Sequence, residues 1–220
     1  MTRVTILLIT LFFTLVFTQI FSPSVHASNS WVLKKEANGI QVFLRNTPGS
    51  ALKSFKGVIN IPARLSTLVA VIEDTKVYPQ LLQKCKSARD IKIIGNNQSY
   101  KHIITDMPWP VKDRDMIVHS VMQQNKQSKQ VEIKMKAAPK MLPLTAGKVR
   151  ITTMAGRWLL IPEKNGTKVI YEMNVDPAGN LPKWLVNTIP IDMPLNTLNN
   201  LRVLVKRPVY KQVKHAFIVD

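Results

Sequence analysis

Cysteine is nearly missing from this chain, since Cys85 is the only one among 220 residues. A lone thiol excludes an intramolecular disulfide framework and any Cys-x-x-Cys redox or metal motif. The four histidines follow no metal-ligand spacing, so we predict neither a metal site nor a cofactor. No G-x-S-x-G or other nucleophile signature is present. Cys85 lies in a Leu/Val-rich neighbourhood and is expected to be a buried, unreactive thiol.

Acidic residues are also scarce, with 13 Asp+Glu against 31 Lys+Arg and a formal net charge of +18. Apolar residues make up 45% and charged residues 20%, a composition that excludes wholesale disorder. The length is sufficient for a real hydrophobic core without disulfides. A basic chain of this kind first suggests a nucleic-acid partner.

Long apolar runs are absent except at the N-terminus. Arg3 precedes the run Val4–Phe21, which ends before Pro23, and small residues lead to Ala27. This pattern predicts a Sec-type signal peptide over residues 1–27 and a single domain over 28–220. The alternative is an uncleaved segment that anchors the chain in the inner membrane.

Export changes the interpretation of the charge. The signal peptide contains one basic and no acidic residue, so the remaining chain keeps a net charge of +17. We expect the protein in the periplasm of a Gram-negative bacterium, where it does not meet nucleic acid. Anionic membrane surfaces attract basic patches there. The alternative is a solvated basic surface with no specific partner.

The middle of the chain reads mainly as strands. Strands are predicted at 40–45 and 52–61, the second with a bulge near Gly57. Helical spacing follows Pro62, at Leu65, Leu68 and Ile72, and a short helix is expected over 78–84. Further strands are predicted at 88–94, 98–106, 114–123, 130–138, 147–161 and 167–176. Consecutive short strands joined by turns indicate an antiparallel sheet.

The last forty residues are predicted to be helical, with interruptions at Pro190 and Pro194. An apolar stripe comprises Leu195, Leu198, Leu201, Leu204 and Val205, continued by Val209, Val213 and Phe217. The basic residues on the opposite side are Arg202, Lys206, Lys211 and Lys214, and we expect them to face anionic headgroups. These elements indicate an α+β fold in which a curved antiparallel sheet wraps around a long C-terminal helix and encloses a cavity.

Several local motifs, in order, resemble the START superfamily of lipid-transfer domains, whose fold is called helix-grip. They are Trp31 with LKKEANGIQVFLR, GSALKSFKG, Tyr78 with Cys85, PWPVKDRD (108–115), GKVR (147–150), GRW (156–158) and DPAGNLPKWL (176–185). The first of these corresponds to the opening helix and first strand of the family. The resemblance implies a tunnel that takes one lipid-like molecule, gated by the loop 106–113 together with the C-terminal helix.

The gate loop contains Met107, Trp109 and Val111. An exposed Trp109 would suit a membrane interface, whereas the alternative is a packed structural corner. On the following strand, alternation places Met116, Val118, Ser120 and Met122 on one face.

The resemblance directs that face of the strand, with the helix residues Leu195, Leu198 and Leu201, toward the tunnel. Arg150, Ser120 and Tyr171 are the candidates for orienting a head group. Ser120 stands where some sterol carriers of the family have arginine, which puts sterol recognition by an ion pair in doubt.

The charged triplet Asp113-Arg114-Asp115 is predicted to be structural, with Arg114 pairing to a carboxylate. Tyr100, His102 and Asp106 share one strand parity and are predicted to be a hydrogen-bonded group rather than a catalytic one. We therefore expect a monomeric binding protein, and a transfer protein, for a lipid or other hydrophobic ligand. Two alternatives stay open: a cyclase-type enzyme, since aromatase/cyclases share the helix-grip fold, and a basic envelope scaffold without ligand.

Overall fold

The computed structural model describes residues 30–48, 50 and 52–220, so the predicted signal peptide lies outside the described residues. A curved sheet dominates the molecule, in the order β1-β2-β3-β10-β9-β7-β6-β5-β4, with antiparallel neighbours throughout. The short β8 pairs in parallel with the start of β6. The strands are β1 (Val32–Ala37), β2 (Ile40–Arg45), β3 (Ser54–Ile61), β4 (Cys85–Ile94), β5 (Gln98–Thr105), β6 (Arg114–Gln124), β7 (Val131–Ala137), β8 (Val149–Ile151), β9 (Thr153–Glu163) and β10 (Gly166–Asp176).

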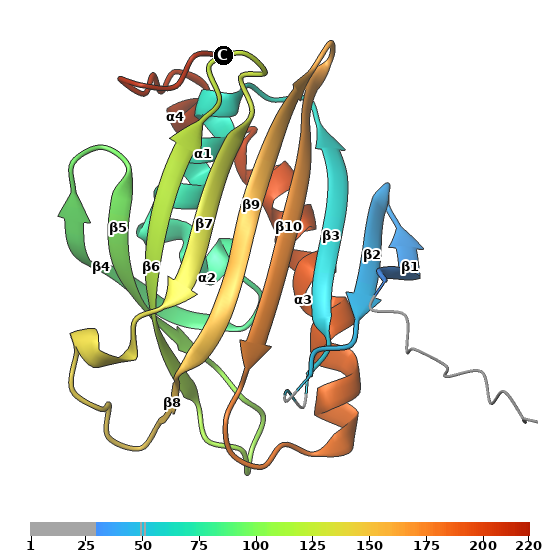
Figure 1. Cartoon of the computed structure of the whole chain (residues 1–220), viewed down its shortest axis with the longest axis vertical. Coiled ribbons are helices and arrows are strands. Elements are labelled where there is room, and N and C mark those ends of the chain that lie inside the picture. Colours follow the sequence, from blue (N-terminus) through green and yellow to red (C-terminus); the bar gives the residue numbers. More distant parts are fainter. Residues whose placement is uncertain (1–29, 49, 51) are drawn as a thin grey trace, which may run out of the picture.

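The helices lie together on one face of this sheet (Figure 1). They are α1 (Leu65–Glu73), α2 (Tyr78–Leu81), α3 (Lys183–Leu204) and α4 (Pro208–Lys211), with the 3-10 turns η1 (Thr75–Val77) and η2 (Pro139–Met141). The long α3 packs against β2 and β3. This arrangement confirms the predicted α+β fold with a sheet gripping a C-terminal helix. Within the described residues, none of the helices combines the length and hydropathy needed to cross a bilayer.

One helix prediction and one strand prediction were wrong, and strand pairing explains both. Residues after Trp31 form β1 rather than a helix, because Asn38 and Gly39, with φ of 54° and 72°, turn the chain back into a hairpin with β2. The single strand predicted over 147–161 is two strands. β8 pairs with β6, and after residue 151 the chain changes partner, so that β9 pairs with β7 and β10.

The prolines of the C-terminal region do not interrupt the helix, contrary to the sequence prediction. α3 runs through Pro190 and Pro194, both of which are buried. Packing against the sheet compensates for the backbone hydrogen bonds that proline cannot donate. The helix ends at Leu204, however, so the exposed Val209 belongs to a separate short helix and does not continue the stripe.

Gly57 explains how α3 approaches the sheet so closely. A β-carbon added at Gly57 would lie 2.6 Å from Leu198 Cδ1 and 3.1 Å from Pro194 Cβ. The pairing of β3 with β2 and β10 continues through this position without a register shift, so the predicted bulge is not there. A side chain at Gly57 would have to displace Leu198 and would crowd Pro194, so glycine suits this close approach.

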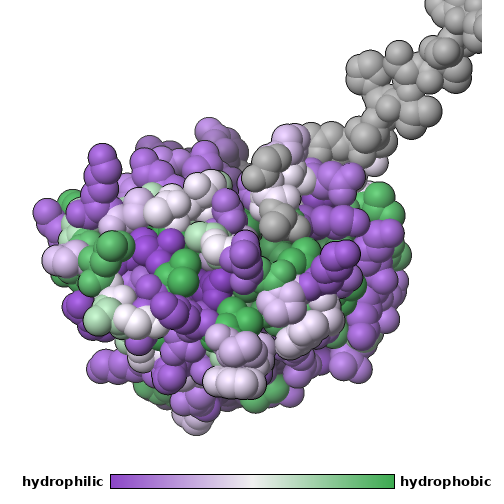
Figure 2. Space-filling view, turned by 90° about the horizontal axis from the view of Figure 1, so that it is seen from below, coloured by the Kyte–Doolittle hydropathy of each residue, from purple (hydrophilic) through white to green (hydrophobic). Residues whose placement is uncertain are grey.

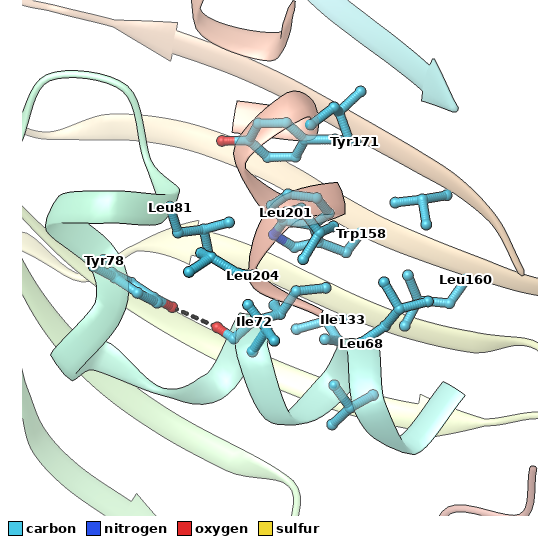
Figure 3. Packing of buried hydrophobic residues seen from close by; sticks show 14 of the residues in the cluster. Leu68, Ile72, Tyr78, Leu81, Ile133, Trp158, Leu160, Tyr171, Leu201 and Leu204 are labelled. Atoms are coloured by element: carbon cyan, nitrogen blue, oxygen red, sulfur yellow. Dashed lines mark hydrogen bonds between the residues drawn. The ribbon is translucent and has the colours of Figure 1, made fainter. Parts of the chain in front are cut away.

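One hydrophobic core fills most of the space between sheet and helices (Figure 3). Trp158 and Tyr171 stack with ring centroids 4.0 Å apart, and Phe55 meets Tyr171 edge-on at 5.2 Å. Tyr78 Oη donates to the carbonyl of Ile72 at 2.9 Å, which ties α2 to α1. The buried aromatic residues therefore fill the middle of the interface between the sheet and α3. The two pockets described below lie at the ends of this interface.

Candidate functional site

A cavity of about 260 Å³ lies at the end of the molecule where β6 and α3 begin, the lower end in Figure 1. Its walls come from the end of β5 and the gate loop, the start of β6, the ends of β8 and β10, and α3, together with residues that precede β3 and β4. The lining residues are Leu52, Gln83, Lys84, Thr105, Asp106, Met107, Pro108, Arg114, Met116, Ile151, Val175, Pro177, Trp184, Leu185, Thr188, Ile189, Asp192 and Met193. Most of this lining is apolar, as expected for a small-molecule pocket.

The α3 wall consists of residues 184, 185, 188, 189, 192 and 193. Spacings of three and four place these residues on one face of a helix. The same spacing was visible in the sequence at Trp184, Leu185 and Ile189. It predicted a helix there, but it did not show that this turn, rather than Leu198 and Leu201, borders the open space.

The charged residues Asp113, Arg114 and Asp115 lie at the mouth of the cavity, where the gate loop leads into β6. Each of the three side chains holds a different segment of the chain. Asp113 accepts from Lys86 Nζ at 3.0 Å and from the backbone N–H of Met107 at 3.2 Å, which fixes the gate loop. The hydrogen bond from Lys86 lowers the pKa of the Asp113 carboxyl. Asp113 thus keeps the loop attached to the edge strand β4.

Arg114 holds the segment that leads into α3. Its Nε, Nη1 and Nη2 donate to the carbonyls of Pro177, Lys112 and Ala178 at 3.1, 2.6 and 2.9 Å. The prediction that Arg114 pairs with a carboxylate was therefore wrong, because backbone carbonyls occupy the donors of its guanidinium. The side chain is buried, and burial lowers its pKa.

Asp115 anchors the long connection between β7 and β8. Its Oδ2 accepts from Arg150 Nη2 at 2.7 Å, Thr145 Oγ1 at 2.7 Å and His102 Nε2 at 3.2 Å. Burial would raise the pKa of Asp115, but these hydrogen bonds outweigh it and lower the pKa. Arg150 also donates to the carbonyls of Pro139, Leu142 and Pro143. Arg150 is thus placed to hold the connection and does not line the cavity.

The structure separates the other predicted cavity residues. Met116 lines this cavity, whereas Met122 borders a second pocket at the opposite end of β6. Core packing surrounds Val118, Tyr171, Leu198 and Leu201, with Leu195 half-buried beside them, and Ser120 is buried without lining either pocket. Ligand contact by these core residues stays a prediction.

The gate loop presents one side chain inward and one outward. Met107 lines the cavity, while Trp109 is 93% exposed and Val111 lies half-buried at a neighbouring groove. The exposure of Trp109 is incompatible with a packed corner. Trp184, 57% exposed, stands at the start of α3 and lines the same cavity. Figure 2, viewed from this end, shows apolar side chains among polar ones on this face.

The predicted basic surface lies elsewhere. α4 and the C-terminal segment are at the opposite end of the molecule from the gate loop (Figure 1). Lys206, Lys211 and Lys214 are exposed, but Arg202 donates to the Asn38 carbonyl at 2.7 Å and so holds the β1–β2 turn. Arg202 is therefore engaged in the fold.

A second, polar pocket of about 330 Å³ occupies that opposite end, between the β4–β5 turn and the C-terminal segment. Lys101 is buried in its wall, with Nζ 2.7 Å from Glu73 Oε2, 2.6 Å from Ser99 Oγ and 3.7 Å from Asp90 Oδ1. His215 lines the same pocket, and its buried Nε2 has no partner among the described residues.

The three residues of the predicted Tyr100–His102–Asp106 group have separate partners. His102 bonds Asp115, whereas Tyr100 stacks on His119 at 4.4 Å and Asp106 lies near Lys86, so the expected Tyr–His–Asp group does not assemble. Cys85 is buried as predicted, and burial raises its pKa to about 11.

Sequence reasoning missed Gln83 and Asp192 as cavity residues. Asp192 was detectable as an acid on the apolar turn pattern of the C-terminal helix, but Gln83 carried no signal.

Comparison with known proteins agrees with this geometry. The START domain model matches residues 24–191. The uncharacterized protein PA1579 of Pseudomonas aeruginosa is 33% identical over 176 residues, covering 80% of this chain and 86% of that protein. The crystal structure of a STAR-related lipid transfer protein from Xanthomonas axonopodis is 32% identical, with a TM-score of 0.75, and covers 80% of this chain and 99% of that one.

Human STARD10 is a more distant structural neighbour. It is 21% identical with a TM-score of 0.70, covers 83% of this chain and 76% of its own, and so shows the shared fold. The family model covers the gate loop, the sheet and the first part of α3, which are the elements that build the cavity. The chain therefore belongs to the START domain family.

Proposed function

We propose that this protein binds a lipid or other hydrophobic molecule in the cavity between the gate loop and α3, and transfers it at a membrane surface. The observation that carries this proposal is the cavity itself, which is mostly apolar and has a gate-loop wall at the mouth. Burial of apolar ligand surface there yields about 25 cal/mol per Å². A volume near 260 Å³ is small for a lipid, so the gate loop and α3 must separate for a larger one to enter.

Membrane contact is assigned to the cavity end rather than to the basic residues of the C-terminal region. Trp109 and Trp184 are both exposed there, and tryptophan favours the membrane–water interface. Docking through these side chains would bring the mouth to the bilayer, so that a ligand passes without crossing water. We further propose that the mature protein works in the periplasm, as its N-terminal sequence predicts.

The hydrogen bonds of the charged residues at the cavity mouth support a binding function rather than a catalytic one. Arg114 and Asp115 are occupied by structural partners, and the predicted Tyr–His–Asp group does not form. These side chains are therefore engaged in holding segments of the fold. A cyclase-type activity remains the second candidate on grounds of fold, but it has no such observation in its favour.

The test is native mass spectrometry of residues 28–220 purified from a bacterial periplasm, followed by transfer of the extracted lipid between vesicles. We expect one lipid class at near one-to-one stoichiometry. Trp109→Ala should slow transfer about tenfold while leaving the bound fraction unchanged, because the side chain lies outside the cavity. A protein that stays empty after incubation with total membrane lipid contradicts the proposal, and unaltered transfer by Trp109→Ala contradicts the docking surface.

A further inference from the structure

The two most exposed large apolar side chains of the described residues lie at the cavity end of the molecule. Trp109 is 93% exposed in the gate loop, and Leu144 is 80% exposed in the connection between β7 and β8, residues 138–148. Met141 of the same connection is also exposed. Single exposed apolar residues are common on protein surfaces, but two neighbouring loops that each present one at the same end indicate a contact surface.

The β7–β8 connection is held from inside, which keeps its apolar tip turned outward. Arg150 donates to three of its backbone carbonyls, those of Pro139, Leu142 and Pro143, at 2.6, 3.1 and 2.7 Å. Asp115 Oδ2 in turn accepts from Arg150 Nη2 at 2.7 Å. Because these carbonyls point toward a buried guanidinium, the tip cannot fold back onto the body without breaking hydrogen bonds to a charged group.

The connection lies beside the gate loop. The backbone N–H of Val149, the first residue after the connection, donates to the carbonyl of Asp113, the last residue of the gate loop, at 2.9 Å. In Figure 1 the connection, the gate loop and the start of α3 all lie at the lower end. Leu144, Trp109 and Trp184 are therefore exposed on three segments at the same end of the molecule.

The charges of these two loops favour an anionic partner. The connection contains two lysines and no acidic residue, and both Lys140 and, in the gate loop, Lys112 are exposed. The two acids of the gate loop, Asp106 and Asp113, lie 3.9 and 3.0 Å from Lys86 Nζ, so an adjacent cation already offsets part of their charge. Apolar side chains flanked by lysines match the boundary between headgroups and acyl chains in an anionic bilayer.

We propose that the β7–β8 connection is a second docking loop, whose tip Leu144 inserts into a bilayer containing anionic lipid while Lys112 and Lys140 lie against the headgroups. The inference rests on the proposed function, because it adds a loop and a lipid charge to the same membrane contact. It also gives a role to an apolar tip that the fold keeps out of the core.

A fluorescent label at the tip tests the insertion. Leu144→Cys is labelled with an iodoacetamide of the fluorophore NBD at neutral pH, where Cys85 stays unreactive because burial shields it and raises its pKa to about 11. Val209→Cys is the matched control, at a site that is 67% exposed at the opposite end of the molecule. Vesicles of equal parts phosphatidylcholine and phosphatidylglycerol should raise NBD fluorescence severalfold at position 144 and leave it constant at position 209.

Vesicle co-sedimentation measures what the tip and the lysines contribute. Leu144→Ser should weaken binding to these vesicles about tenfold, the order expected when a leucine side chain loses burial in an apolar phase, whereas Val209→Ser should change it less than twofold. Lys112→Gln with Lys140→Gln should also weaken binding about tenfold, and vesicles of phosphatidylcholine alone should bind the wild-type protein much more weakly. The ligand-bound fraction seen by native mass spectrometry should not change, since these side chains lie outside the cavity lining.

The outcomes separate this inference from the function beneath it. If the label at position 144 does not respond while Trp109→Ala still weakens vesicle binding, the second docking loop is wrong and docking through the gate loop stands. A response at position 209 instead would assign the contact to the C-terminal end. Equal binding to both kinds of vesicle overturns the preference for anionic lipid. If the protein binds neither, this inference and the docking part of the proposed function both fail, whereas ligand binding in the cavity is judged separately by mass spectrometry.

Discussion

Two methionines on the same face of β6, six residues apart, border two very different spaces. Met116 faces the apolar cavity at the gate end, where polar side chains stand without partners. Met122 faces the pocket near the C-terminal segment, where Lys101 is enclosed by Glu73 and Asp90. Between the two, the strand is packed into the core at Val118. At the C-terminal end the charges of Lys101, Glu73 and Asp90 satisfy each other, whereas at the gate end Asp192 has no ion-pair partner among the described residues.

The largest effect should come from breaking the charge cluster at the polar end. Lys101→Ala leaves Glu73 and Asp90 facing each other without their cation. Because both carboxylates are partly exposed to solvent, at 26% and 35%, the loss should be smaller than for a fully buried pair, about 2 kcal/mol. Urea unfolding measures the loss. Asp192→Asn at the gate end, where no pair exists, should leave the free energy of unfolding within about 0.5 kcal/mol of wild type. Equal losses in the two variants would contradict the division between the ends.

A second pair of substitutions tests whether the two pockets are connected. Met116→Phe enlarges a side chain that lines the gate-end cavity and should weaken ligand binding about tenfold by filling it. Met122→Phe makes the same substitution in the other pocket and should leave affinity at the gate end unchanged. Titration of both variants with 1-dodecanol is the measurement. Comparable weakening by Met122→Phe would mean that the spaces join into one tunnel when ligand is bound.

A third prediction concerns pH and the polar end. Burial lowers the pKa of His215 below 6.5, although Glu73 and Asp220 oppose this. The unfolded chain then takes up the proton first, so the contribution of His215 to stability is complete above about pH 6.5 and is lost as pH falls further. Melting temperatures between pH 7 and 5 should decline, and His215→Gln should decline less. Parallel curves would remove His215 as a cause.

The smallest effect is expected from the basic residues near the C-terminus. If the gate end meets the membrane, Lys211→Gln with Lys214→Gln should change co-sedimentation with anionic vesicles less than twofold. Were these side chains the docking surface, each would account for roughly 1 kcal/mol, and the pair would weaken binding more than tenfold. That larger loss would transfer the membrane-facing role to the C-terminal end.

The sheet was largely predictable from the sequence because it is built from local signals. Alternating strands such as 114–123 and turns such as Asn165-Gly166 can be recognised from a few neighbouring residues. The wrong predictions concern elements whose conformation depends on the segment they pack against or pair with. The continuity of α3 through Pro190 depends on packing, and the division between β8 and β9 depends on which strand each one meets.

The site was predictable only in part, for the same reason. Met116 and Met107 could be placed because strand alternation and the gate-loop motif are local patterns. Arg150 is charged and near the expected mouth, but only the fold shows that Asp115 and three carbonyls hold it. Gln83 follows no periodic pattern, since its place in the cavity results from the way α2 meets α3.

The two open edges of the sheet both carry basic residues, and both are irregular. β4 has Lys86, Arg89 and Lys92 along its length, with breaks in register on either side of Arg89, and β1 has a break at Lys34. Charged, bulged edges resist pairing with the edge of another chain. Part of the excess of lysine and arginine therefore protects a long sheet against aggregation, a role that requires neither ligand nor membrane.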